Sequence, residues 1–214
     1  MSSSHLPALD HATIAALRAR LDRPVVLVGM MGVGKSSLGR RLAALLDVPF
    51  ADADEAIEQA AHMSIPEIFA TYGEAYFRAG ERRVIARLIG GEGDDPAAGS
   101  SAVKVIATGG GAFCHPETRA LILRSAIAVW LDADLDTLVE RTARKDNRPL
   151  LQGGDPRTIL AALMAEREAD YATAPIRVKS GHVPHQRTLG QLAQALLAWL
   201  APPAPSTITA AAAP

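Results

Sequence analysis

Several residue types that define particular classes of protein are scarce in this sequence of 214 residues. Cys114 is the only cysteine, which excludes a disulfide within the chain and a zinc site built on several cysteines. The formal net charge is -1, so no basic excess points to nucleic acid and no acidic excess points to disorder. We therefore expect a globular protein that works in a reducing compartment.

Long hydrophobic runs are also missing. The longest apolar stretches, such as 25–28 and 126–131, are far shorter than the roughly 18 residues that a membrane span requires. The first residues, M-S-S-S-H-L-P, lack the basic start and the apolar core of a secretory signal. We expect a cytoplasmic protein that has neither a membrane nor a nucleic acid among its partners.

The segments that are present alternate between short apolar runs and one-sided helical patterns. Buried strands are predicted at 24–28, 103–107, 127–131 and 176–179. Helices are predicted at 35–46, 54–61, 74–89 and 134–142 and from Pro156 onwards. A closing helix is expected to begin at a capping box formed by Thr188 and Gln191. Such alternation is typical of an α/β protein with a central parallel sheet flanked by helices, in which ligands bind at the carboxyl ends of the strands.

One domain accounts for most of the chain. Residues 23–201 carry the alternating pattern, and residues 1–22 read as an N-terminal extension with a helix. Residues 202–214 are rich in proline and alanine and cannot bury enough apolar surface to order themselves, so a disordered tail is expected. Residues 90–102 have the composition of a surface loop inside the domain.

The most specific motif is Gly29-x4-Gly34-Lys35-Ser36, which lies between the strand at 24–28 and a helix. This is the Walker A pattern, in which backbone N–H groups surround phosphate oxygens and the positive end of a helix dipole faces the anion. Lys35 would reach the β- and γ-phosphates, and the Ser36 hydroxyl could bind Mg²⁺. A chance match is the alternative, and the flanking strand and helix argue against it. The sequence therefore predicts a nucleoside-triphosphate site.

Other classes of P-loop protein have less support. The N-K-x-D segment of guanine-specific switches does not occur, and V-W-L-D at Asp132 is a weak match to the acidic strand end of an ATPase motor. A short chain with an early P-loop fits a kinase of small molecules better.

Further motifs follow in order along the chain. They are Asp52-Ala53-Asp54, Phe77-Arg78-Ala79-Gly80-Glu81, Gly109-Gly110-Gly111, Arg148-Pro149-Leu150-Leu151, and Arg167 with Tyr171. Together with the P-loop they resemble the shikimate kinase family, over about residues 23–200. The resemblance implies a P-loop kinase fold with a helical substrate-binding segment and a lid at about 141–155. It also implies that the γ-phosphoryl group of ATP is transferred to the 3-hydroxyl of shikimate, in aromatic amino-acid biosynthesis, with Mg²⁺ as cofactor.

The resemblance also assigns roles to individual residues. The catalytic residues would be Lys35, Asp54 and Arg148. The substrate-binding residues would be Asp54, Arg78, Gly109, Gly110, Gly111 and Arg167. The ATP-binding residues would be Gly32, Val33, Gly34, Lys35, Ser36, Ser37, Arg141 and Arg148. Mg²⁺ would be bound by Ser36 and, through water, by Asp52.

These residue types suit a substrate with one carboxylate and several hydroxyls. Arginine binds carboxylates through a planar fork, which fits Arg78 and Arg167. Asp54 would accept a hydrogen bond from the attacking hydroxyl and orient it or remove its proton. Each residue also has a simpler interpretation. Arg78 would pair with Glu74 or Glu81 on its own helix, Arg167 would be solvated, and Asp54 would cap a helix.

Several alternatives stay open. Arg141 could be a helix-surface residue beside Glu140, Cys114 a small buried thiol, and Glu81 a support for Arg78 or for a water molecule. Ser37 stands where the family usually has threonine, and the adenine contacts after Val178 match only loosely. The rival enzyme is a kinase for another acidic polyol, such as gluconate. A rival from another class is a nucleotide-binding module that has lost catalysis. We expect a monomer, because no spare amphipathic face calls for a partner.

Overall fold

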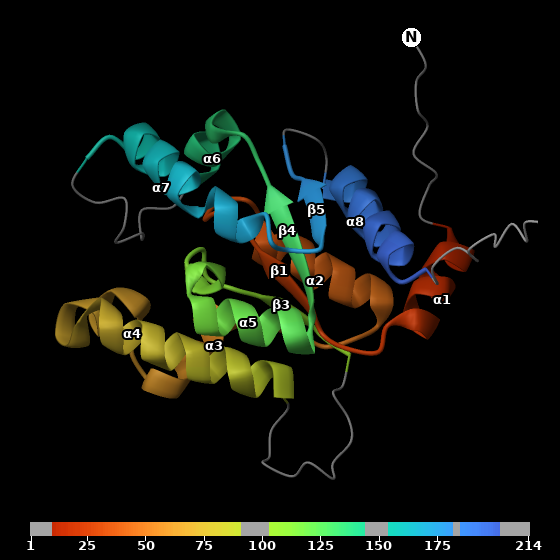
Figure 1. Cartoon of the computed structure of the whole chain (residues 1–214), viewed down its shortest axis with the longest axis horizontal. Helices are drawn as coiled ribbons and strands as arrows, with labels where there is room; N and C mark the ends of the chain where they lie inside the picture. Colours follow the sequence, from red (N-terminus) through yellow and green to blue (C-terminus); the bar gives the residue numbers. More distant parts are fainter. Residues whose placement is uncertain (1–9, 91–102, 144–153, 182–184, 202–214) are drawn as a thin grey trace, which may run out of the picture.

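The computed structural model describes residues 10–90, 103–143, 154–181 and 185–201 (Figure 1). Its centre is a five-stranded sheet of order β2-β3-β1-β4-β5, in which every pairing is parallel. The strands are β1 (Val25–Val28), β2 (Phe50–Asp52), β3 (Val105–Ala107), β4 (Ile127–Asp132) and β5 (Ile176–Lys179). This sheet confirms the predicted α/β class.

Helices cover both faces of the sheet (Figure 1). One side holds α1 (His11–Arg20), α2 (Lys35–Leu46) and α8 (His185–Trp199). The other side holds α3 (Ala53–Ala61), α4 (Ile65–Gly90), the short 3-10 helix η1 (Ala112–Cys114) and α5 (Pro116–Ser125). Beyond the tip of β4 lie α6 (Leu135–Thr142) and α7 (Pro156–Tyr171). None of the helices in the described ranges is long and apolar enough to cross a membrane.

The central strand, β1, shows why a run without alternation becomes a buried parallel strand. All of its residues are 0% exposed, because helices cover both faces and strands lie on both edges. Val25 lies beside Val105 of β3 on one edge and beside Ile127 of β4 on the other. The order of the strands thus reverses at β1, with β3 and β2 on one side and β4 and β5 on the other. Open parallel sheets bind ligands at such a point, outside the carboxyl ends of the strands.

Local signals place several helices as predicted. Helix α2 has the expected bounds, and its last turn ends at Asp47 with a left-handed φ of 55°. Ser64 and Glu67, which have capping-box spacing in the sequence, form such a box at the start of α4. The Ser64 N–H donates to Glu67 Oε2 at 2.8 Å and the Glu67 N–H donates to Ser64 Oγ at 3.4 Å. Asp155 caps α7 by accepting from the Thr158 N–H at 2.9 Å.

The structure corrects the predicted start of the closing helix. Helix α8 begins at His185, so Thr188 lies inside it rather than at its cap. The side chain of Thr188 faces the interior, with 3% of the residue exposed. A spacing that fits a capping box therefore arose inside a helix. The short strand β2, η1 and α5 were not predicted.

Some predictions about the ends and loops stay untested. The expected tail at 202–214, the loop residues 91–102 and the lid residues 144–153 lie outside the described residues. The division of the chain into an extension, one kinase domain and a tail thus remains a prediction.

The glycine that follows β1 is held in a narrow space. Gly29 has a φ of 132°, and a Cβ atom there would lie 2.3 Å from the carbonyl oxygen of Leu131. Alanine at this position would strain its own backbone and collide with the neighbouring strand. We expect Gly29→Ala to lower the free energy of unfolding by about 2–4 kcal/mol in urea denaturation.

Gly80 offers a matched control. A Cβ atom at Gly80 would meet nothing within 4 Å, and the residue lies in the interior of α4. Because alanine has the higher helix propensity, Gly80→Ala should raise the free energy of unfolding by about 0.5–1 kcal/mol. Similar losses in both variants would contradict the steric explanation for Gly29.

Candidate active site

The nucleotide-binding motif forms the loop between β1 and α2. Gly32 and Gly34 have φ values of 82° and 100°, in the left-handed region that glycine adopts without strain. Within the described residues no side chain caps α2, so the N–H groups of its first turn are left for water or a ligand. Lys35 is 8% exposed, and its Nζ donates to the carbonyl oxygens of Gly29 at 2.7 Å and Met30 at 3.0 Å. The loop therefore has the geometry of an anion site.

Arg141 reaches this loop from α6. Its Nη1 donates to the Val33 carbonyl at 3.1 Å and to Ser180 Oγ at 3.4 Å, and its Nη2 donates to the Gly181 carbonyl at 2.7 Å. Ser180 Oγ also donates to the Val33 carbonyl, at 3.0 Å. Arg141 is thus not the simple helix-surface residue of the alternative interpretation. Ser180 and Gly181 were not predicted as site residues, although their position directly after β5, at the carboxyl edge of the sheet, was a usable signal.

The two acidic residues after β2 have different partners. Asp52 is the N-cap of α3, because its Oδ1 accepts from the Asp54 N–H at 3.1 Å. Asp54 is therefore not the cap. Burial, and next the charge of Asp52, raise the pKa of Asp54 to about 6, while the positive charge of Lys35 acts in the opposite direction. A carboxyl with this pKa is ionised at neutral pH and is a better proton acceptor than an ordinary aspartate.

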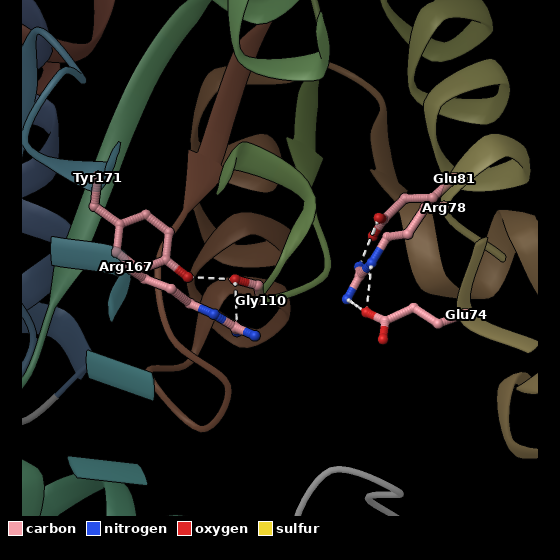
Figure 2. Close-up of polar contacts among 6 residues, drawn as sticks. All are labelled: Glu74, Arg78, Glu81, Gly110, Arg167 and Tyr171. Atoms are coloured by element: carbon pink, nitrogen blue, oxygen red, sulfur yellow. Dashed lines mark hydrogen bonds and ion pairs between the residues drawn. The ribbon is translucent and has the colours of Figure 1, made fainter. Parts of the chain in front are cut away.

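Arg78 and Glu81 form an ion pair on α4 (Figure 2). Arg78 Nη1 donates to Glu81 Oε2 at 2.8 Å, and Arg78 Nη2 donates to Glu74 Oε1 at 3.1 Å. Both pairings of the simpler interpretation are therefore present, but the side chain of Arg78 is only 17% exposed. Glu81 is 2% exposed, and its Oε1 has no hydrogen-bond partner within the described residues. Burial raises the pKa of Glu81, against the effect of Arg78.

The glycine triplet after β3 is where these groups meet. A Cβ atom at Gly109 would lie 2.8 Å from Glu81 Oε1 and 2.9 Å from an oxygen of Asp54. A Cβ atom at Gly111 would lie 2.7 Å from Arg78 Nη2, and one at Gly110 would lie 3.1 Å from the P-loop backbone. No side chain fits here without displacing a charged group or the P-loop. The triplet is therefore a closely packed wall of the site rather than a plain turn.

Arg167 approaches the triplet from α7. Its Nη1 donates to the Gly110 carbonyl at 3.3 Å, and the Tyr171 hydroxyl donates to the same oxygen. Arg167 is 7% exposed, which contradicts its interpretation as a solvated residue. Figure 2 shows Arg167 and Arg78 extending toward each other from α7 and α4, with Gly110 between the two helices. Two guanidinium groups that face one space form a site suited to a carboxylate.

Other candidate residues do not join this site or cannot be placed. Arg148 lies outside the described residues, so its role stays a prediction.

Asp132 Oδ2 binds Arg177 Nη2 at 2.7 Å and Lys179 Nζ at 2.5 Å, so the charge of Asp132 is neutralised at the edge of the sheet. Burial raises the pKa of the half-buried Cys114 thiol, which makes it a poor nucleophile. The described ranges contain no group of three or more His, Cys, Asp or Glu residues that could hold a metal.

A parallel sheet with a P-loop after its central strand, and with acidic and basic groups at the neighbouring strand ends, defines a P-loop kinase of small molecules. A statistical model of the family "Shikimate kinase" matches residues 31–199. The chain is 62% identical over 193 residues to the shikimate kinase of Novosphingobium aromaticivorans, which covers 90% of this chain and 96% of the relative. The chain therefore belongs to the shikimate kinase family, as its motifs indicated.

Solved structures agree with this assignment. The shikimate kinase from Acinetobacter baumannii in complex with shikimate is 32% identical, with a TM-score of 0.76, over 86% of this chain and 97% of that chain. A gluconokinase from Sinorhizobium meliloti is 16% identical, with a TM-score of 0.53, over 84% of this chain and 94% of that chain. The second likeness concerns the fold alone.

The pKa of Asp54 leads to a prediction for stability. Its value rises from 3.8 to about 6 on folding, so the folded state binds more protons between these values and becomes less stable as pH rises through them. Asp54→Asn removes this penalty. In urea denaturation at pH 7.5 it should be about 1–3 kcal/mol more stable than the native chain, and the difference should shrink toward zero near pH 4.

Asp136→Asn serves as the control, because the side chain of Asp136 is 72% exposed. Its effect on the free energy of unfolding should be small at both pH values. A gain for Asp54→Asn that is the same at pH 7.5 and pH 4 would show that ionisation of Asp54 is not its cause.

Proposed function

We propose that this chain transfers the γ-phosphoryl group of ATP to the 3-hydroxyl of shikimate, giving 3-phosphoshikimate and ADP, in aromatic amino-acid biosynthesis. The observation that carries the proposal is the pair of arginines, Arg78 and Arg167, which extend toward each other across the glycine triplet. Together they can bind one carboxylate, and Asp54 beside Gly109 offers an acceptor to a hydroxyl of the same ligand. The A. baumannii relative, whose structure holds shikimate, supports this choice of substrate.

ATP would be bound on the other side of the triplet by the P-loop. Backbone N–H groups and hydroxyls would hold the phosphates, from Gly32, Val33, Gly34, Lys35, Ser36 and Ser37. Lys35 would exchange its two carbonyl partners for β- and γ-phosphate oxygens. Arg141, fixed between the P-loop and the segment after β5, would stack on the adenine. Arg148 would add positive charge near the migrating phosphoryl group.

Mg²⁺ suits the oxygen donors at this edge of the sheet. The charge of Asp52 is close enough to raise the pKa of Asp54, and a divalent cation would offset that repulsion. The exposed hydroxyl of Ser36 and, through water, the carboxylate of Asp52 would hold the ion, with water and phosphate oxygens completing its shell. When bound, Mg²⁺ neutralises negative charge on the transferring phosphoryl group.

Asp54 would act on the attacking hydroxyl. As the oxygen forms its bond to the γ-phosphorus, the bond from that phosphorus to the bridging oxygen of ADP breaks, and the hydroxyl proton passes to Asp54. The transition state of phosphoryl transfer is loose in most analyses, so orientation of the hydroxyl contributes more than early removal of its proton. The Asp54 carboxylate lies close to Gly109 of the triplet, and this fixed position would orient the hydroxyl.

We also propose that the chain acts as a monomer. The large apolar side chains that are exposed within the described residues are Tyr72, Tyr76, Leu123 and Trp199. They lie on three different helices, α4, α5 and α8. Tyr72 and Tyr76 contact each other, with ring centroids 4.6 Å apart, and a small exposed apolar surface of this kind does not require a partner.

Release of ADP tests the reaction directly. The purified chain would be mixed with ATP and Mg²⁺ alone, with shikimate, and with gluconate. We expect a large increase in ADP release with shikimate and none with gluconate, because the acceptor site is built for one carboxylate and a neighbouring hydroxyl at fixed positions. An equal increase with gluconate would move the assignment to another acidic polyol. ATP binding without an increase from either acid would favour a module that has lost catalysis.

Arg78→Lys tests the substrate side. Lysine keeps a positive charge beside Glu81 but loses the planar fork, so the KM for shikimate should rise about tenfold or more while the KM for ATP stays within about twofold. Arg83→Lys is the matched control, since Arg83 lies exposed on the same helix and makes no hydrogen bond or ion pair within the described residues. An unchanged KM for shikimate in Arg78→Lys would remove Arg78 from the substrate site.

A further inference from the structure

Arg119, on α5, joins the segment after the glycine triplet to α7. Its Nη1 donates to the carbonyl oxygens of Phe113 at 3.1 Å and Cys114 at 3.2 Å, and it forms a 2.7 Å ion pair with Asp170 Oδ1. The side chains of Arg119 and Asp170 are 21% and 30% exposed, so water screens the pair only in part. Neither residue was predicted to bind ATP or the substrate.

This ion pair lies beside the contacts that hold Arg167. In the sequence of α7, Asp170 lies between Arg167 and Tyr171. The side chains of Arg167 and Tyr171 both donate to the Gly110 carbonyl (Figure 2). The ring of Tyr171 also stacks on Trp130, with the centroids 5.8 Å apart. The end of α7 is thus fastened at two places, to the triplet by Arg167 and Tyr171 and to η1 by the Asp170 ion pair.

The beginning of α7 is attached differently. Arg157 pairs with Asp136 of α6 at the same distance, 2.7 Å, but the two side chains are 56% and 72% exposed. An exposed pair of this kind contributes little. Within the described residues, Arg157 Nη1 makes no hydrogen bond to a carbonyl oxygen like those that Arg119 makes. Among the ion pairs of α7 in the described residues, the one at its end, beside Arg167, is thus better shielded from water than the one at its beginning.

We propose that Arg119 and Asp170 are positioning residues for the substrate carboxylate. Their ion pair holds the last two turns of α7 against η1, so that the guanidinium of Arg167 faces that of Arg78. The inference rests on the proposed function, because it assumes that these two arginines bind one carboxylate. Binding through a planar fork depends closely on geometry, and a displacement of about 1 Å far from the chemistry can cost an enzyme up to about 100-fold.

Asp170→Ala tests the proposal with little risk to the helix, since alanine is the best helix former. Arg119 keeps its two carbonyl acceptors in this variant. We expect the Kd for shikimate, measured by isothermal titration calorimetry, to rise about 5- to 10-fold, with the KM for ATP changed less than about twofold. Asp170→Glu, whose carboxylate can still reach Arg119, should recover most of the affinity.

Asp136→Ala is the matched control, because it removes the other 2.7 Å ion pair of α7. Its Kd for shikimate should stay within about twofold of the native value. If the two variants weaken shikimate binding equally, the cause is a general loosening of α7 and the proposal is wrong. If Asp170→Ala leaves the Kd unchanged, the proposal is also wrong.

A double-mutant cycle tests whether Asp170 acts through Arg167. In an Arg167→Lys background, Asp170→Ala should weaken shikimate binding by less than about twofold, because the group that it positions is already altered. An effect as large as in the native background would overturn the proposal. Failure of the proposed function would look different, since shikimate would then not stimulate ADP release by the native chain at all.

Discussion

The substrate side of the site depends on one nearly buried carboxylate, that of Glu81. A carboxylate with 2% exposure is costly unless it is neutralised and hydrogen-bonded. The 2.8 Å contact with Arg78 neutralises the charge and hydrogen-bonds one of the two carboxylate oxygens, and it brings the Arg78 guanidinium against Gly111. The other oxygen of Glu81 faces Gly109, where an oxygen of Asp54 also lies. The requirement to neutralise one buried charge therefore fixes the positions of a basic and an acidic group at the triplet.

The order of the strands brings the rest of the site to this place. In the sequence, the P-loop, the segment Asp52-Ala53-Asp54 and the triplet are far apart. They lie at the ends of β1, β2 and β3, which are neighbours in the sheet. Asp52 lies in register with Ala107, and Leu27 lies in register with the same residue on the other side. Thr108 connects the end of β3 to β1, because its Oγ1 donates to the Leu27 carbonyl at 3.1 Å. The triplet can then contact both the phosphate side and the substrate side.

The sequence predicted those parts of the fold that rest on local signals. Strand β1 and helix α2 were found because a β-branched run, a glycine turn and a one-sided helix follow one another within a few residues. Strand β2 was missed because its three residues, Phe50–Asp52, are only half-buried and owe their conformation to pairing with β3. Thr188 was misjudged because a capping-box spacing carries no information about which side chains face the interior.

The candidate site was predictable to a similar extent. Walker A, the two acids and the arginines were recognisable as motifs, and the parallel sheet explains why they converge. Contacts between distant segments were not predictable. Tyr171 and Gly110 are 61 positions apart, and Arg141 and Ser180 are 39 apart. Such pairs depend on how α6 and α7 pack over the finished sheet, for which no periodicity or spacing exists in the chain.

The arrangement of charge explains how the proposed site would select its substrate. Arg78 and Arg167, which extend toward each other, form the basic side of the site near Gly110 and Gly111, and Asp54 forms the acidic side near Gly109. The glycine wall fixes the separation between these two sides. A ligand whose carboxylate and hydroxyl are held on a rigid ring can meet both sides without losing internal freedom. An open-chain polyol acid carries the same groups but must give up several bond rotations to place them, which weakens binding. The wall can have this role only while Arg167 is held in place, because one mobile arginine would let the separation adapt to either ligand. Rigidity at the end of α7 is therefore as much a part of selectivity as the charged groups themselves.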